Sequence, residues 1–148
     1  MKITIIAVGK VKSNNYLNDI KNYLKQINYP ISIIEVNDEP KITGIKKEAL
    51  NILKKIPPQS YLISLDSQGK SFDSLEFSKH LEKLIETQKR GIVFIIGGSF
   101  GLDQLILEKS DESLSLSKLT FPHRMARLIL VEQIYRAFKI MAKHPYHK

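Results

Sequence analysis

The sequence contains no cysteine. This absence excludes disulfide bonds, thiolate metal sites and a cysteine nucleophile, so only histidines and carboxylates remain as candidate metal ligands. Four scattered histidines are a weak basis for a metal site. We therefore expect no bound metal.

Long apolar runs are also missing. No stretch approaches the roughly 20 residues that a membrane helix needs, and the segment that begins at Met1 lacks the charged and apolar regions of a signal peptide. We expect a cytosolic protein with no membrane partner. Because 148 residues suffice for one core of ordinary size and no linker-like run interrupts them, we predict a single domain over residues 1–148.

Acidic residues are scarce near the carboxyl end of the chain. The segment from Lys118 to Lys148 contains seven lysines and arginines and only one acid, Glu132. It therefore carries most of the formal net charge of the whole chain, which is +8. Basic side chains displace condensed counterions when they bind nucleic acid, so this segment predicts an RNA partner. For the first 117 residues the alternative interpretation, an ordinary solvated surface, is preferred.

Apolar periodicity predicts strands and helices in alternation, which is typical of an α/β fold with a mostly parallel sheet flanked by helices. The run 92–96 has no polar alternation and predicts a central strand covered on both faces. Asp73 and Glu76 predict a capping box, and Ser13 or Asn14 an N-cap. The predicted strands are 2–9, 31–36, 61–65, 92–96 and 113–116, and the predicted helices are 14–26, 45–55, 73–85, 103–109 and 122–143.

Three loops follow the carboxyl ends of predicted strands, where open parallel sheets bind ligands. The glycine loop 97–101 lacks the spacing of dinucleotide-binding and phosphate-cradling loops, which disfavours those enzymes. A tight turn without a ligand is the alternative for this loop. The segment 114–123 alternates apolar and hydroxyl residues, and Leu65 ends another strand. Together these loops suit an adenine and a sulfonium, neither of which needs a phosphate site.

Four segments carry a resemblance to a known family: LDSQGKSFDS (65–74), FIIGGSFGL (94–102), LSLSKLTFPHRMARLILVEQIYRAFKI (114–140) and the terminal HPYHK. Together they resemble the ribosomal RNA large subunit methyltransferase H family, which belongs to the SPOUT superfamily of knotted methyltransferases. The likeness spans the whole chain, and the region from LTFPH to YRAFKI together with the terminal YHK is specific to the family. The region between Asp38 and Ile52 is shorter than in the relatives.

The resemblance implies a fold whose C-terminal part forms a deep trefoil knot, a rare feature that spacing alone does not predict. It implies a homodimer that binds S-adenosylmethionine and methylates N3 of a pseudouridine in 23S rRNA within the assembled ribosome, each pocket being completed by the partner subunit. By the same resemblance, the residues lining the cofactor site are Leu65, Gly97, Leu116, Ser117, Lys118, Leu119, Thr120 and Phe121.

The long predicted helix supports a dimer independently. Apolar residues occupy both a stripe through Leu128, Val131, Tyr135 and Phe138 and much of the remaining circumference. One apolar face is enough for packing on a sheet, so the second face predicts a two-fold partner. A wholly internal helix in a monomer is the alternative.

Methylation of a ring nitrogen requires that its proton leave, so a base or a nearby cation is needed. The candidates are His144, Tyr146, His147 and Lys148, with no choice among them, and Tyr146 could instead stack on the nucleobase. His123 lies nearer the cofactor loop and is expected to cap or pack at the helix start. Candidate RNA contacts, some of which are expected to form salt bridges instead, are Arg124, Arg127, Arg136 and Lys143.

Glu132 is the predicted helical partner of Arg136.

Two rival functions remain open from the sequence. A non-catalytic RNA-binding module would keep the basic segment but bind no cofactor. A tRNA methyltransferase of the same superfamily would bind the cofactor but modify another RNA.

Overall fold

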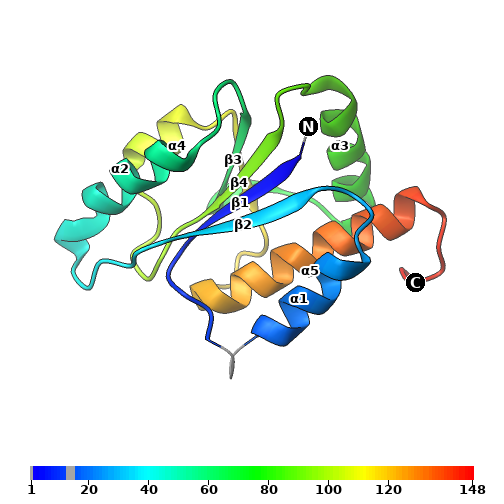
Figure 1. Cartoon of the computed structure of the whole chain (residues 1–148), viewed down its shortest axis with the longest axis horizontal. Coiled ribbons are helices and arrows are strands. Elements are labelled where there is room, and N and C mark those ends of the chain that lie inside the picture. Colours follow the sequence, from blue (N-terminus) through cyan, green and yellow to red (C-terminus); the bar gives the residue numbers. More distant parts are fainter. Residues whose placement is uncertain (1, 13–15) are drawn as a thin grey trace.

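The computed structural model describes residues 2–12 and 16–148, which form one sheet with helices on both of its faces (Figure 1). Five strands pair in the order β2-β1-β4-β3-β5, and all pairings between these strands are parallel. The predicted α/β fold is confirmed. The elements are β1 (Ile3–Val8), α1 (Leu17–Gln26), β2 (Ile31–Val36), η1 (Ile42–Gly44), α2 (Ile45–Lys55), β3 (Tyr61–Ser71), α3 (Ser74–Thr87), β4 (Ile92–Ile96), α4 (Gln104–Lys109), β5 (Glu112–Ser115) and α5 (His123–Met141).

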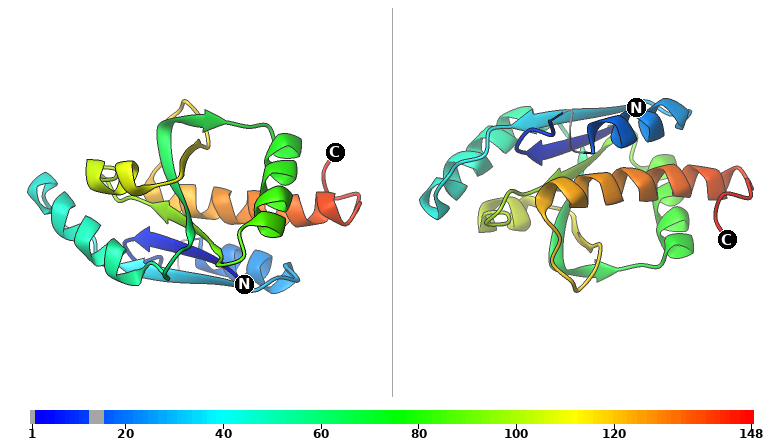
Figure 2. Two further views of the ribbon diagram at one scale, coloured as in Figure 1. Left: turned by 90° about the horizontal axis from the view of Figure 1, so that it is seen from above. Right: turned by 90° about the horizontal axis from the view of Figure 1, so that it is seen from below.

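Helices α1, α3 and α5 cover one face of the sheet, and α2 and α4 cover the other (Figure 2). Successive strand residues point to opposite faces, so each strand supplies both layers. Ile5 and Phe94 pack in the same core as Leu130 of α5, whereas Ile6 packs in the second core with Ile52 of α2. The long α5 therefore rests on one face along much of its length.

Strand β4 is central, as the unbroken apolar run predicted. It pairs with β1 on one side and with β3 on the other. All five of its residues are buried. Its two neighbours carry their carboxyl ends to the same edge of the sheet, which brings their loops together.

Strand β3 is longer than predicted, because the segment 66–71 continues the strand in place of the expected loop. Leu65 and Lys70 both pair with Leu114 of β5, so the residues between them bulge out of the ladder. Gly69 makes this possible: a Cβ there would lie 2.6 Å from the carbonyl carbon of Ser113. Only a residue without a side chain permits this close approach of two backbones.

The capping box at the start of α3 is confirmed. The Glu76 backbone N–H donates to the Asp73 carboxylate at 2.7 Å, and the Asp73 N–H donates back to the Glu76 carboxylate at 3.2 Å. The predicted N-cap at Ser13 or Asn14 lies outside the described residues. Helix α5 begins one residue later than predicted, at His123, and ends at Met141.

Candidate functional site

A shallow hollow of about 180 Å³ lies between the bulged part of β3 and the segment that follows β5. Its walls mix leucines and a phenylalanine with hydroxyl groups and one carboxylate. Such a surface suits a partly apolar ligand that carries a few polar groups. The lining residues are Leu65, Asp66, Ser67, Leu114, Leu116, Ser117, Leu119, Thr120 and Phe121.

Six of the eight predicted cofactor residues line this hollow; the other two, Lys118 and Gly97, do not. Lys118 is exposed beside it. Sequence reasoning missed Asp66, Ser67 and Leu114. Asp66 and Ser67 directly follow Leu65 in the sequence. Leu114 pairs with Leu65 between β3 and β5, so the strand register was the signal that could have found it.

Gly97 lies at the end of β4, the strand next to β3, within a loop that folds back on itself. The Gly101 N–H donates to the Gly98 carbonyl at 3.0 Å. A Cβ on Gly97 would lie 2.6 Å from the Gly101 carbonyl carbon, and Gly101 has a φ of +76°. Both glycines are therefore required by the turn itself, and a cofactor contact from Gly97 stays a prediction.

The start of α5 is fastened to the end of β1 by two arginines. Arg124 Nε donates to the carbonyl of Lys10 at 2.9 Å. Arg127 donates from Nη2 to the Gly9 carbonyl at 2.8 Å and from Nη1 to Glu35 at 2.6 Å. These bonds hold the helix, and with it the loop that forms the hollow, against the first two strands.

Arg127 forms a salt bridge, the alternative role expected for some arginines of this segment. Its residue exposure is only 2%, and its charge is paired with Glu35. A buried, paired arginine is poorly available to a phosphate. The observed pairing disfavours Arg127 as an RNA contact, and the residue stabilises the fold.

His123 packs at the helix start, which was one of its two expected roles. Burial lowers the pKa of His123, and Asp38 opposes that shift from 4.0 Å away. Its Nε2 is buried without a hydrogen-bond partner among the described residues. A Cβ on Gly9 would lie 3.0 Å from this nitrogen, so the ring has little room to move.

The C-terminal residues fold back onto α5, where Tyr146 packs against the edge of the core. The Tyr146 hydroxyl donates to the Glu132 carboxylate at 2.9 Å, and Arg136 donates to the same carboxylate from Nε and Nη2 at 3.0 and 2.6 Å. The Tyr146 ring meets Tyr135 edge-on, with centroids 4.8 Å apart. The predicted pairing of Glu132 with Arg136 is thus confirmed, and it also anchors the tail.

The other tail residues differ in their surroundings. His144 Nδ1 accepts a hydrogen bond from the Tyr146 N–H at 3.1 Å. His147 Nδ1 lies 3.0 Å from an Arg136 nitrogen. Lys143 and Lys148 are exposed. Burial and the hydrogen bond to Glu132 raise the pKa of Tyr146, so its hydroxyl keeps its proton at neutral pH.

The tail and the hollow are separate within one chain. Helix α5 rises about 1.5 Å per residue, which places Glu132 about 14 Å along the axis from His123. The tail packs near Glu132, and no described residue after Phe121 lines the hollow. The structure therefore does not bring the predicted catalytic and cofactor residues together in a single subunit.

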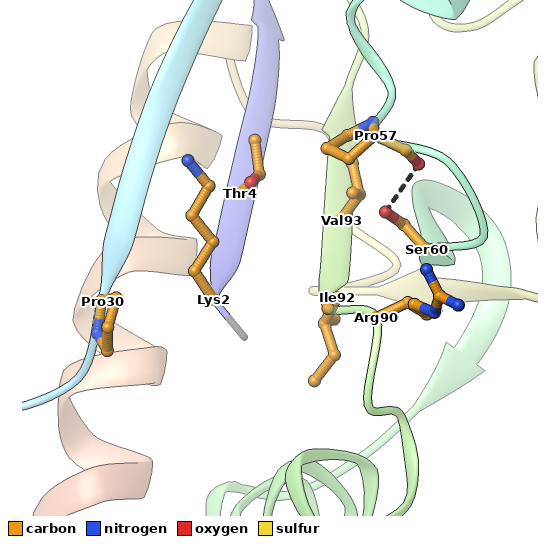
Figure 3. Close-up of a pocket in the computed structure, with 9 residues that line it drawn as sticks. Lys2, Thr4, Pro30, Pro57, Ser60, Arg90, Ile92 and Val93 are labelled. Carbon is orange, nitrogen blue, oxygen red and sulfur yellow. Dashed lines mark hydrogen bonds between the residues drawn. The ribbon is translucent and has the colours of Figure 1, made fainter.

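Another cavity, of about 390 Å³, lies at the opposite edge, where the strands begin (Figure 3). Lys2 and Arg90 flank it on its two sides and are exposed. The Ser60 hydroxyl there already donates to the Pro57 carbonyl at 2.8 Å. None of the predicted site residues lines this cavity, so the hollow at the carboxyl edge is the stronger candidate.

No helix within 2–12 and 16–148 has both the length and the apolar character needed to cross a membrane. Over the same ranges, the histidines and carboxylates form no group of three or more that could hold a metal ion.

Residues 1–147 match the family model described as "Predicted SPOUT methyltransferase". The chain is 49% identical over its full length to the ribosomal RNA large subunit methyltransferase H of Acholeplasma laidlawii and 45% identical to that of Carboxydothermus hydrogenoformans, and each alignment covers 100% of both chains. The chain belongs to this family of methyltransferases. The resemblance drawn from its motifs is confirmed.

Solved structures of other proteins share the fold of this chain at low sequence identity. A methylase family protein from Haemophilus influenzae superimposes with a TM-score of 0.60 at 15% identity, covering 99% of this chain and 70% of that one. The SpoU methyltransferase AviRb of Streptomyces viridochromogenes, solved with AdoMet, gives 0.51 at 10% identity, covering 97% and 59%. These matches support the arrangement of strands and helices.

Replacing Arg127 by glutamine should lower the free energy of unfolding by about 1–3 kcal/mol at pH 7, because Glu35 loses its buried partner. Burial by itself raises the pKa of Glu35, but hydrogen bonds from Arg127 and the Val11 N–H outweigh it and lower the pKa below the usual 4.5. The stabilisation is thus present at neutral pH and lost as the pH falls through this lowered value. Denaturant unfolding at pH 7 and in acid measures both effects.

The matched control is Arg90→Gln, which removes an exposed arginine and should leave stability nearly unchanged at either pH. An Arg127→Gln protein with wild-type stability and weakened RNA binding would instead restore the sequence-based prediction.

Proposed function

We propose that this chain transfers a methyl group from S-adenosylmethionine to N3 of a pseudouridine in 23S rRNA of the assembled ribosome. The observation that carries the proposal is the full-length identity of 45–49% with relatives named ribosomal RNA large subunit methyltransferase H. The target nucleotide and the atom come from the resemblance of the motifs. The structure contributes a hollow of suitable chemistry and a basic C-terminal segment.

The residues of the hollow fit the proposed cofactor. Leu65, Leu116 and Phe121 offer apolar walls for an adenine ring. Asp66 supplies a carboxylate near which a positive sulfonium or amino group is favoured. Among the residues that the structure describes, no lysine or arginine lines the hollow, which agrees with a ligand that carries no phosphate. When bound, S-adenosylmethionine would supply a methyl group on a positively charged sulfur.

The reaction needs one proton removed and one methyl group transferred. The ring nitrogen would give its proton to a base, for which His144, His147 and Lys148 remain candidates, and would then take the methyl group that the bound cofactor supplies. Since the cofactor supplies the reactive group, this chain must hold the two partners in line and lower the cost of the anion. Tyr146 is disfavoured as the base, because its hydroxyl donates to Glu132 and its pKa is raised.

The basic segment supports an RNA substrate even without Arg127, which is buried and paired with Glu35. Lys143 and Lys148 are exposed near the tail, and Lys118 is exposed beside the hollow. RNA phosphates lying across both places would meet exposed positive charge at each. Arg136 is tied to Glu132 and is better placed to organise the tail than to contact phosphate.

We further propose a homodimer in which the tail of one subunit completes the hollow of the other. The hollow of one chain is smaller than the roughly 300–1,000 Å³ of typical small-molecule sites, and Leu119 on its rim is 72% exposed. Since the tail packs well away from the hollow of its own chain, a contribution to the reaction requires a second copy. The trefoil knot stays a prediction of the family resemblance.

Incubation with S-adenosylmethionine carrying a labelled methyl group should label assembled ribosomes in preference to free rRNA and tRNA. Mass spectrometry of the digested 23S rRNA should then place the label on a pseudouridine. Label in tRNA would favour the rival tRNA methyltransferase. A calorimetric titration that shows no binding of the cofactor would favour a non-catalytic RNA-binding protein.

Removal of Tyr146 to Lys148 should abolish transfer while leaving the affinity for S-adenosylmethionine nearly unchanged, because these residues do not touch the hollow of their own chain. Turnover on ribosomes and calorimetry with the cofactor measure the two quantities separately. A fully active truncated protein would refute a catalytic role for the tail.

A further inference from the structure

A chain of side-chain contacts runs from α3 across α5 to the tail. The Ser74 hydroxyl donates to Gln133 at 2.7 Å, and the Gln133 amide donates to Glu132 at 2.8 Å. Glu132 accepts hydrogen bonds from Nε and Nη2 of Arg136. The remaining terminal nitrogen of Arg136, Nη1, contacts His147. Each guanidinium nitrogen of Arg136 therefore has an assigned partner within the described residues.

This arrangement determines which nitrogen of His147 can carry a proton. A guanidinium has only N–H groups and no acceptor, so in the 3.0 Å contact with Arg136 it must be the donor and His147 Nδ1 the acceptor. An accepting Nδ1 has no proton. In a neutral ring the single proton then resides on Nε2, the nitrogen that points away from Arg136.

Arg136 is firmly placed for this role. Its side chain is 25% exposed and that of Glu132 is 17% exposed. The guanidinium also lies 4.8 Å from the centre of the Tyr146 ring, a cation–π distance. The hydrogen bonds to Glu132, opposed in part by burial, raise the pKa of Arg136 further, so its charge is permanent.

We propose that Arg136 is a positioning residue that fixes His147 as the Nε2–H tautomer, so that His147 acts in methyl transfer as a hydrogen-bond donor and not as the base. The inference rests on the proposed function for its chemical consequence. When the ring nitrogen of the target base loses its proton, negative charge spreads onto the neighbouring carbonyl oxygens. A fixed N–H aimed at such an oxygen stabilises that charge and makes the proton easier to remove.

Two charged groups lie near His147. Arg136 on α5 donates a hydrogen bond to its Nδ1. The other group is the carboxylate of Asp73, the N-cap of α3. The hydrogen bond from the Glu76 N–H is the largest cause that lowers the pKa of Asp73, and His147 is a minor one.

Nitrogen-15 NMR of the intact protein labelled at histidine tests the tautomer without any substrate. His147→Gln identifies the His147 resonances among the four histidines. The expected result is a protonated Nε2 and an unprotonated Nδ1 in the wild-type protein at neutral pH, with the tautomers mixing in Arg136→Gln. Protonation of both nitrogens in the wild type, or of Nδ1 alone, would overturn the proposal.

This measurement is independent of the RNA substrate. If no RNA is methylated, the proposed function fails while the tautomer can still be found as stated. If methylation occurs with the other tautomer, only the role of Arg136 fails.

Turnover then tests the donor role. His147→Ala should lower kcat by about 100-fold, as loss of one such donor does in other sites, and His147→Gln should recover part of the loss because its amide also donates. Arg136→Gln should lower kcat with little change in cofactor affinity, whereas Arg90→Gln should match the wild type. Equal losses for His147→Gln and His147→Ala, or a loss confined to cofactor affinity, would contradict the donor role.

Discussion

The attachment of α5 to the sheet is the interaction on which the site depends. The buried side chain of Arg127 reaches the Gly9 carbonyl through a bond inside the protein and the Glu35 carboxylate through a bond nearer the surface. The loop that forms most of the hollow precedes this helix, and the residues that hold the tail lie on its later turns. Arg127 thus fixes the start of α5, the helix that connects the loop of the hollow to the residues that hold the tail.

The positive charge of the C-terminal segment is divided between structure and function. Arg127 is enclosed, Arg124 binds the carbonyl of Lys10, and Arg136 organises the tail through Glu132. The lysines at 118, 143 and 148 are exposed, and they are the contacts proposed for RNA. Because a buried pair and a phosphate contact require the same residue type, composition could indicate an RNA partner without showing which side chains bind it.

Local patterns predicted the fold well. The unbroken apolar run 92–96 gave the central strand, and Asp73 with Glu76 gave the capping box, since both depend on neighbours in sequence. The extension of β3 through its bulge was missed because it depends on pairing with β5, about 45 residues away. Six residues that the family motifs predicted for the cofactor site line the hollow, and their contact with a cofactor stays a prediction. Leu114 could be found only from the strand register, because it pairs with Leu65.

Because the tail and the hollow of one chain lie apart, the proposed shared site can be tested with mixed dimers. A chain without residues 146–148 keeps its hollow, and a Ser117→Trp chain with a filled hollow keeps its tail. Neither should be active alone, but mixed dimers contain one intact site, so an equal mixture after subunit exchange should recover about a quarter of wild-type ribosome methylation. A mixture that stays inactive although mass spectrometry shows mixed dimers would contradict a site shared between two subunits.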